Sequence, residues 1–286
     1  MDLRGYSPEE FERQFNPRAA VPDHQPKIDA RVALSREARD RLTGEYDLRY
    51  GPGPKQTLDV FPAAARPAPV HVYFHGGYWR AQDKSDVTFL AEPLTAAGAC
   101  TVIANYDLCP DVSVGQIVEQ TIAAIAWVHA NIAEHGGDPE RIFISGNSAG
   151  AHLCAMALAH DWSADGLPED IVKGAALLTG VYDPEPVLGL SVNEQIRLTA
   201  EAVDGLSPLR NPPRRPLPLL IAVGGAETES WIKQSRDYHE LCRKRGIDAE
   251  YLEMPGEDHF TMTGVMGEPE KPALQAIFRQ MGLSAG

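Results

Sequence analysis

A serine between two glycines is the first residue of this sequence with a clear chemical use. Residues 146–150 read Gly-Asn-Ser-Ala-Gly, after an apolar run and before an alanine-rich one. In a strand–turn–helix with this motif, Ser148 stands on a sharp turn where its hydroxyl can act as a nucleophile. Glycines allow close backbone approach there, and the helix start directs N–H groups at negative charge. Because five-residue patterns also occur by chance, Ser148 needs support from other motifs.

A glycine pair earlier in the chain gives that support. Residues 75–79 read His-Gly-Gly-Tyr-Trp and directly follow the apolar run 70–74. A turn at Gly76 and Gly77 can direct backbone N–H groups at the same point as the N–H of Ala149. Together these donors would form an oxyanion hole, which stabilises the charge that develops when a carbonyl is attacked.

The general base is expected to be a histidine after the last strand of the sheet. His259 fits, because it follows the segment 249–254, which is expected to be that strand. His152 lies four residues after Ser148, on the same side of the expected helix, and is interpreted as a packing or pocket residue. His75 is interpreted as a structural residue that shapes the glycine turn.

The acid that orients the base should follow the preceding strand, expected at 217–223. Glu227 lies at the usual distance after this segment. Glu229, two residues on, and Asp183, after an earlier strand, are alternatives. Glu227 is preferred because its loop should face the loop of His259, and a glutamate can orient an imidazole as an aspartate does.

This set of residues predicts acyl transfer without a metal or an organic cofactor. Ser148 would attack a carbonyl, His259 would take its proton, and Glu227 would hold the imidazole. No histidine and aspartate cluster has the spacing of metal ligands. A non-catalytic binding protein of this fold would usually lack the serine or the histidine, so this alternative is disfavoured.

The elements that must position these residues alternate between strand and helix. Such alternation predicts an α/β fold, with a mostly parallel central sheet and helices on both faces, in a single domain spanning 1–286. Residues 1–45 are expected to form a helical wrap, and 184–213 a small lid-like insertion. Strands are expected at 57–61, 70–74, 100–105, 141–146, 175–178, 217–223 and 249–254, and helices from Ser7 and over 35–42, 89–98, 116–133, 149–160, 191–203 and 235–245.

Composition narrows the class of protein and its partners. The 286 residues have a formal net charge of −14, which argues against nucleic acid and anionic membranes as partners. The first residues lack the apolar run of a signal peptide, and no segment reaches the roughly 20 apolar residues of a membrane helix. The four cysteines are scattered, which suits a reducing cytoplasm. The expected partner is a small-molecule substrate; the oligomeric state is left open, with a homodimer as one option.

The combined motifs resemble the arylformamidase (kynurenine formamidase) branch of the α/β-hydrolases, which is related to the hormone-sensitive-lipase-like esterases. The resemblance spans about Tyr46 to Phe260. Two residues depart from the family pattern: Glu227 stands where aspartate is frequent, and Asn147 where histidine is common. The segments that carry the resemblance are His75–Trp79, Gly146–Leu153, Thr179–Asp183, Gln234-Ser235, Glu257–Phe260 and the early region Arg49–Phe61.

This resemblance implies an α/β-hydrolase fold and hydrolysis of N-formylkynurenine to kynurenine and formate, in tryptophan catabolism. The alternative is a carboxylesterase for short-acyl esters, or a hydrolase of another small amide. Four residues in or beside the motif loops are candidates to contact substrate, although they could equally pack the loops. They are Tyr78, Trp79, Asn147 and Phe260.

Overall fold

A twisted eight-stranded sheet forms the centre of the protein. The computed structural model describes residues 5–284, and its strand order is β1-β2-β4-β3-β5-β6-β7-β8. Strand β2 runs antiparallel to both of its neighbours, and the other pairs are parallel. The strands are β1 (Glu45–Arg49), β2 (Thr57–Phe61), β3 (Ala68–Phe74), β4 (Cys100–Ala104), β5 (Gly137–Asn147), β6 (Val172–Leu178), β7 (Leu219–Gly224) and β8 (Ala249–Met254).

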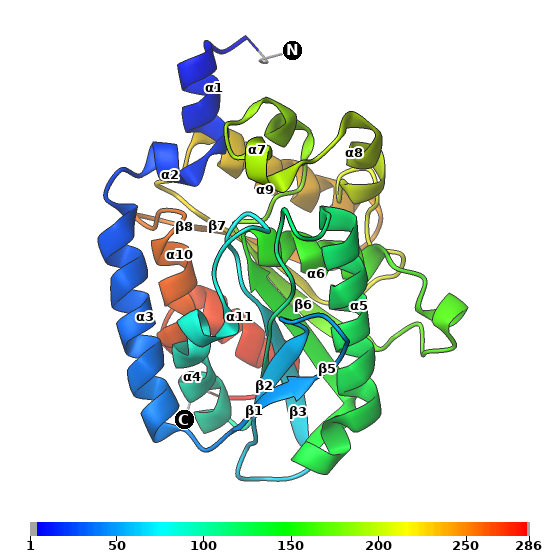
Figure 1. Cartoon of the computed structure of the whole chain (residues 1–286). Helices are drawn as coiled ribbons and strands as arrows, with labels where there is room; N and C mark the ends of the chain where they lie inside the picture. The colour runs from blue at the N-terminus through cyan, green and yellow to red at the C-terminus, as the bar shows by residue number, and fades with distance from the viewer. Residues whose placement is uncertain (1–4, 285–286) are drawn as a thin grey trace.

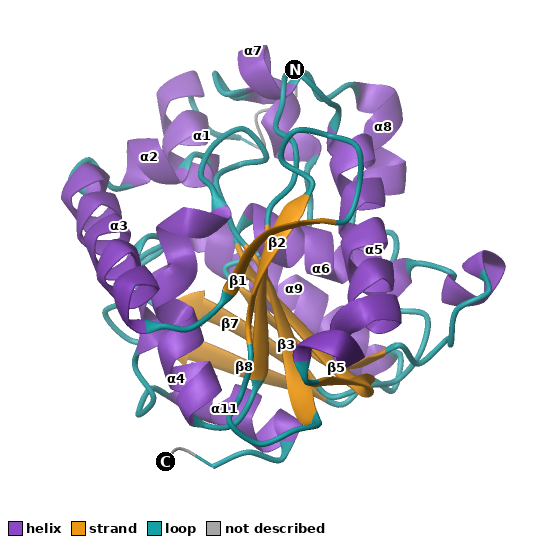
Figure 2. Ribbon diagram, turned by 60° about the horizontal axis from the view of Figure 1, so that its bottom comes forward, coloured by secondary structure: helices purple, strands orange, loops and turns teal. Residues whose placement is uncertain are grey.

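Helices cover both faces of this sheet (Figure 1, Figure 2). The α-helices are α1 (Pro8–Phe15), α2 (Pro17–Ala20), α3 (His24–Arg41), α4 (Ala91–Ala96), α5 (Val114–Asn131), α6 (Ala149–Ala159), α7 (Asn193–Ile196), α8 (Ala200–Leu206), α9 (Glu229–Lys244), α10 (Thr261–Gly264) and α11 (Pro272–Met281). Short 3-10 helices are η1 (Lys84–Leu90), η2 (Ile132–His135), η3 (Trp162–Asp165), η4 (Glu185–Gly189) and η5 (Val265–Gly267).

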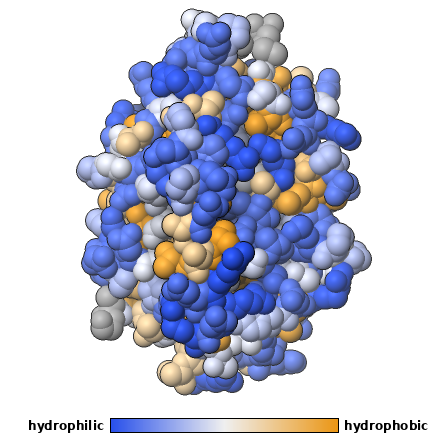
Figure 3. All heavy atoms as spheres, turned by 60° about the vertical axis from the view of Figure 1, so that its left-hand side comes forward, coloured by the Kyte–Doolittle hydropathy of each residue, from blue (hydrophilic) through white to orange (hydrophobic). Residues whose placement is uncertain are grey.

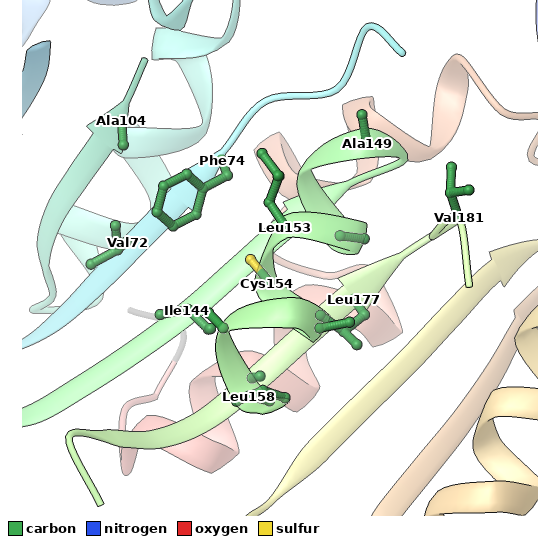
Figure 4. Close-up of a cluster of buried hydrophobic side chains, with 14 of the residues drawn as sticks. Val72, Phe74, Ala104, Ile144, Ala149, Leu153, Cys154, Leu158, Leu177 and Val181 are labelled. Atoms are coloured by element: carbon green, nitrogen blue, oxygen red, sulfur yellow. The ribbon is translucent and has the colours of Figure 1, made fainter. Parts of the chain in front are cut away.

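The two-residue period of the strands divides the core into two layers. Val72 and Phe74 of β3 point into the layer that holds α5, α6 and α9. Tyr73, between them, points into the layer that holds α4 and α11. In Figure 4, Leu153 and Leu158 of α6 lie over the side chains of the central strands. A strand buried on both faces has an unbroken apolar run, as the sequence shows. The predicted α/β-hydrolase fold is confirmed.

The N-terminal wrap is more helical than the sequence predicted. Ser7 caps α1 by accepting the N–H of Glu10. The carboxylate of Glu10 accepts from Arg13 and Gln14, one turn further on. The helix expected at 35–42 begins at His24, as α3. Residues 1–4 of the predicted wrap lie outside the described residues.

The helix predicted over 191–203 is wrong. The chain breaks into α7 and α8, because Arg197 adopts a left-handed conformation with φ of 58°. The side chain of Asn193 holds the break, since it accepts the N–H of Leu198 and donates to its carbonyl. Strand β1 and helix α11 were not predicted.

The described surface has no membrane-spanning element. Within residues 5–284, no helix has both the length and the apolar character needed to cross a bilayer. The face that carries α3 is largely hydrophilic, with a few apolar patches (Figure 3).

Candidate active site

Ser148 stands on a strained turn between β5 and α6. Its φ and ψ are 56° and −116°, a conformation that costs about 1–3 kcal/mol and persists only where the surroundings enforce it. A Cβ on Gly150 would overlap the carbonyl oxygen of Phe74, and one on Gly146 would overlap the backbone of Gly150. Both glycines are therefore required sterically: α6 can pack against the end of β3 only without these side chains.

Three side chains from distant parts of the chain meet at this turn. His259 Nε2 lies 2.9 Å from Ser148 Oγ, and His259 Nδ1 lies 2.7 Å from Glu227 Oε2. An ionised carboxylate can only accept, so Nδ1–H donates to Glu227 and Nε2 is left to accept from the serine hydroxyl. Glu227 Oε1 in turn accepts the N–H of Gly224 at 3.0 Å. The predicted nucleophile, base and acid are thus connected in that order.

The acid and the base are shielded from water. The side chain of Glu227 is 1% exposed and that of His259 is 9% exposed. The Trp231 ring packs against the imidazole, with centroids 4.5 Å apart. Sequence reasoning missed Trp231, and its only signal was its position in the first turn of the helix after the acid loop.

The two alternative acids lie elsewhere. Glu229 is exposed at the start of α9. The carboxylate of Asp183 accepts the N–H of Glu185, and its own N–H donates to Gln234. Neither residue makes a described contact with His259, whereas Glu227 hydrogen-bonds it directly.

The glycine turn after β3 lies directly against the nucleophile. A Cβ built on Gly76 would be 2.8 Å from Asn147 Oδ1 and 3.3 Å from Ser148 Cβ. Gly77 has φ of 108°, in the region that only glycine adopts freely. Within residues 5–284, no protein acceptor is found for the N–H groups of Gly76, Gly77 or Ala149. These donors are therefore available to a ligand.

His75 is part of the framework beneath this turn. It is fully buried, and its two ring nitrogens lie 2.8 Å from Gly76 O and from Asn105 Oδ1. The Tyr106 ring stacks on the imidazole at 4.3 Å, and Asn105 donates to Asp83. Burial lowers the pKa of His75. These contacts agree with a structural residue.

A cavity opens beside Ser148 and has a volume of about 40 Å³, enough for a few water-sized groups. Three of the four predicted substrate contacts line it, namely Tyr78, Asn147 and Phe260. Tyr78 donates its hydroxyl to Phe15 O at 2.7 Å, and Asn147 donates to Thr179 at 3.0 Å. Both side chains are thereby fixed as walls.

Trp79 is placed differently from the expectation. It is fully buried, does not line the cavity, and donates its indole N–H to His152 Nδ1 at 3.2 Å. His152 donates from Nε2 to Leu206 O at 2.8 Å, so this pair ties the glycine loop to α6 and α8. Trp79 is a packing residue: its backbone has φ of 57°, and its ring lies edge-on to the His152 ring with centroids 4.9 Å apart. His152 packs there too, as expected.

The cover of the cavity also differs from the prediction. None of its lining residues comes from 184–213, the segment expected to act as a lid. The N-terminal segment covers it instead, through the residues Asn16, Pro17, Arg18, Ile28 and Arg31. Residues 184–213 touch the site only indirectly, where Arg80 donates to Gln195 at 2.8 Å.

Comparison with known proteins agrees with this geometry. A family model described as alpha/beta hydrolase fold matches residues 71–263. Kynurenine formamidase from Salmo salar is 30% identical over 96% of this chain and 97% of its own length. The enzyme of the same name from Danio rerio is 30% identical over 99% of both chains. A crystal structure from Silicibacter sp. TM1040 is similar, with a TM-score of 0.82, 26% identity, and coverage of 94% of this chain and 98% of the other.

Metal-ligating side chains do not cluster in the described chain. Among residues 5–284, no group of three or more histidine, cysteine, aspartate or glutamate side chains is arranged to hold a metal ion. The acid–base residues next to Ser148 are accounted for by hydrogen bonds to one another.

Proposed function

The chain belongs to the kynurenine formamidase branch of the α/β-hydrolases, and from this premise we propose that it hydrolyses aryl formamides, with N-formylkynurenine as the substrate. The products would be kynurenine and formate. The observation that carries the proposal is the continuous contact from Ser148 through His259 to Glu227, with separations of 2.9 and 2.7 Å, in a chain similar to curated formamidases over its whole length.

The proposed reaction is acyl transfer in two steps. Ser148 Oγ attacks the formyl carbon as its proton passes to His259 Nε2, and Glu227 stabilises the imidazolium that forms. The N–H groups of Gly76, Gly77 and Ala149 would donate hydrogen bonds to the carbonyl oxygen and stabilise the negative charge that develops on it. His259 then protonates the departing aryl amine, and the C–N bond breaks. In the second step His259 activates water, which releases formate from Ser148.

The site suits a very small acyl group. The whole cavity, from Ser148 to Arg31, has a volume of about 40 Å³, and its walls at Tyr78 and Asn147 are fixed by hydrogen bonds. Formyl is the smallest acyl group, and an aryl amine is a better leaving group than an alkyl amine. Phe260, whose ring stacks on His24 at 5.1 Å, supplies an aromatic wall for the leaving group.

Comparing an amide with an ester tests this proposal. We expect kcat/KM for N-formylkynurenine to exceed that for p-nitrophenyl acetate, and Ser148→Ala to abolish both activities. Ester turnover far above formamide turnover would favour the carboxylesterase alternative. A fluorophosphonate probe that labels the wild-type protein and not Ser148→Ala would test the nucleophile independently of the substrate.

The domain organisation, the cellular location and the oligomeric state of the enzyme are also part of the proposal. We propose one catalytic domain that acts in the cytoplasm; in support, all four cysteines are buried free thiols. A homodimer stays a prediction, and sedimentation of the purified protein would measure it.

A further inference from the structure

Arg31 of α3 presents an unpaired guanidinium group to the catalytic cavity. The residue is 6% exposed, yet it lines the same cavity as Ser148 and His259. Its Nε and Nη2 atoms are buried, and neither finds a hydrogen-bond acceptor among the described residues. Burial lowers the pKa of this guanidinium, but an arginine stays charged in proteins. A buried cation without a partner is costly, so this arrangement calls for an anionic ligand.

The charges around the cavity point the same way. Three arginines line it, Arg18, Arg31 and Arg80, and none of the lining residues is an aspartate or a glutamate. This excess of cations stands out in a chain with a net charge of −14. Arg80 donates from Nη1 to Gln195 while its Nε is buried without an acceptor among the described residues, and Arg18 is exposed. Arg31 differs from both because two of its guanidinium nitrogens, Nε and Nη2, are buried without an acceptor and no described side chain accepts from it.

Nearby carboxylates have other partners. Asp86, which attracts Arg31 at longer range, accepts the N–H of Asp83 at 3.0 Å. Asp258 pairs with Lys27 at 2.5 Å, and Glu257 with Lys271 at 2.7 Å. The fold thus provides acids close to α3 without directing one at the Nε and Nη2 atoms of Arg31.

Arg31 also marks the side towards which a leaving group would extend. Together with Phe260 it lines a second cavity, of about 570 Å³, between α3 and residues of α4, α10 and η5, whose other charged lining residues are Lys27, Glu92, Glu257 and Glu268. Arg31 and Phe260 line the cavity of Ser148 as well, so the part of a substrate that follows the acyl group lies within reach of Arg31. A planar guanidinium can grip a carboxylate there through two parallel hydrogen bonds.

We propose that Arg31 binds a carboxylate on the leaving-group side of the substrate and so selects amino-acid-like aryl formamides over neutral ones. This inference rests on the proposed hydrolase function. It names a specificity-determining residue that comes from the N-terminal wrap.

The test compares N-formylkynurenine with its carboxamide, in which a neutral amide replaces the carboxylate. Removing one partner of a buried, hydrogen-bonded charge pair strongly weakens binding. We therefore expect Arg31→Met to lower kcat/KM for the acid by about 100-fold, mostly through KM, and for the carboxamide by less than about threefold. Arg31→Lys should recover part of the loss, because lysine keeps the positive charge but cannot make the two parallel hydrogen bonds of a guanidinium.

Two controls separate binding from folding. Arg36→Met changes an exposed arginine of the same helix and should leave both substrates unaffected. Arg31→Met removes an unpaired buried charge, so its melting temperature should equal or exceed that of the wild type. Equal losses on the acid and the carboxamide, or no loss on either, would overturn the proposal; so would a melting temperature that falls together with both activities.

A second substrate pair keeps this inference separate from the formamidase proposal. The pair is 3-(4-acetoxyphenyl)propanoate and its carboxamide, which are aryl acetates with and without a carboxylate. If neither formamide is hydrolysed but the ester pair shows an Arg31-dependent preference for the acid, the formamidase proposal fails and the role of Arg31 stands. If the formamides are hydrolysed but Arg31 produces no preference for the acid in either pair, the formamidase proposal stands and the role of Arg31 is refuted.

Discussion

Replacing Glu227 by glutamine tests whether the carboxylate fixes the tautomer of the base. Glu227 uses one oxygen for the Gly224 N–H, at 3.0 Å, and the other for His259 Nδ1, at 2.7 Å. A glutamine has only one oxygen. If that oxygen keeps the Gly224 N–H, the new NH₂ faces Nδ1. The imidazole must then carry its proton on Nε2, facing Ser148, and cannot act as the base.

The opposite orientation of the amide is also unfavourable. It would set NH₂ against the buried Gly224 N–H, and an unsatisfied buried donor costs about 1–3 kcal/mol. A wrong imidazole tautomer lowers kcat about 10⁴-fold in a serine protease. We therefore expect Glu227→Gln to lower kcat by about 10³- to 10⁴-fold, equivalent to roughly 4–5.5 kcal/mol of barrier.

The assay is steady-state hydrolysis of N-formylkynurenine by the two proteins, with their far-UV circular dichroism compared. Glu229→Gln is the matched control, since it makes the same change at an exposed site two residues away, and it should keep kcat within about twofold. The reasoning is refuted if Glu227→Gln keeps more than about a tenth of the wild-type kcat with its fold intact, or if Glu229→Gln loses as much.

Four further substitutions test other parts of the site. Ser148→Ala and His259→Ala should each lower kcat by several orders of magnitude; near-normal turnover by His259→Ala would contradict its assignment as base. Gly150→Ala places a methyl group against the Phe74 carbonyl, so we expect a loss of about 1–3 kcal/mol in the free energy of unfolding; unchanged stability in urea titration would show that α6 can shift. Trp231→Ala removes a buried ring from beside His259 and should cost about 3–5 kcal/mol of stability; an unchanged denaturation midpoint would argue against this packing.

Much of the fold could be predicted from the sequence because its signals are local. Strand β8 has the predicted bounds, and β2 does as well, since short apolar segments between polar turns determine them. Helix α11 was missed although it is amphipathic. The break at Arg197 was missed because its cause is the pairing of Asn193 with Leu198, which a helical pattern does not reveal.

The chemistry of the site was encoded in the sequence by itself, and its enclosure was decided by the tertiary structure. Glycines around Ser148, a glycine pair after β3 and a histidine after β8 follow from chain order, because parallel strands bring their carboxyl ends to one edge of a sheet. Nothing local indicates that Trp79 turns inwards, or that α2 and α3 cover the cavity in place of 184–213. Nor does the sequence of α3 reveal that one of its arginines, Arg31, has a guanidinium group buried without a partner among the described residues. Those properties depend on which surfaces pack together after the chain has folded, and they exist only between residues far apart in the sequence.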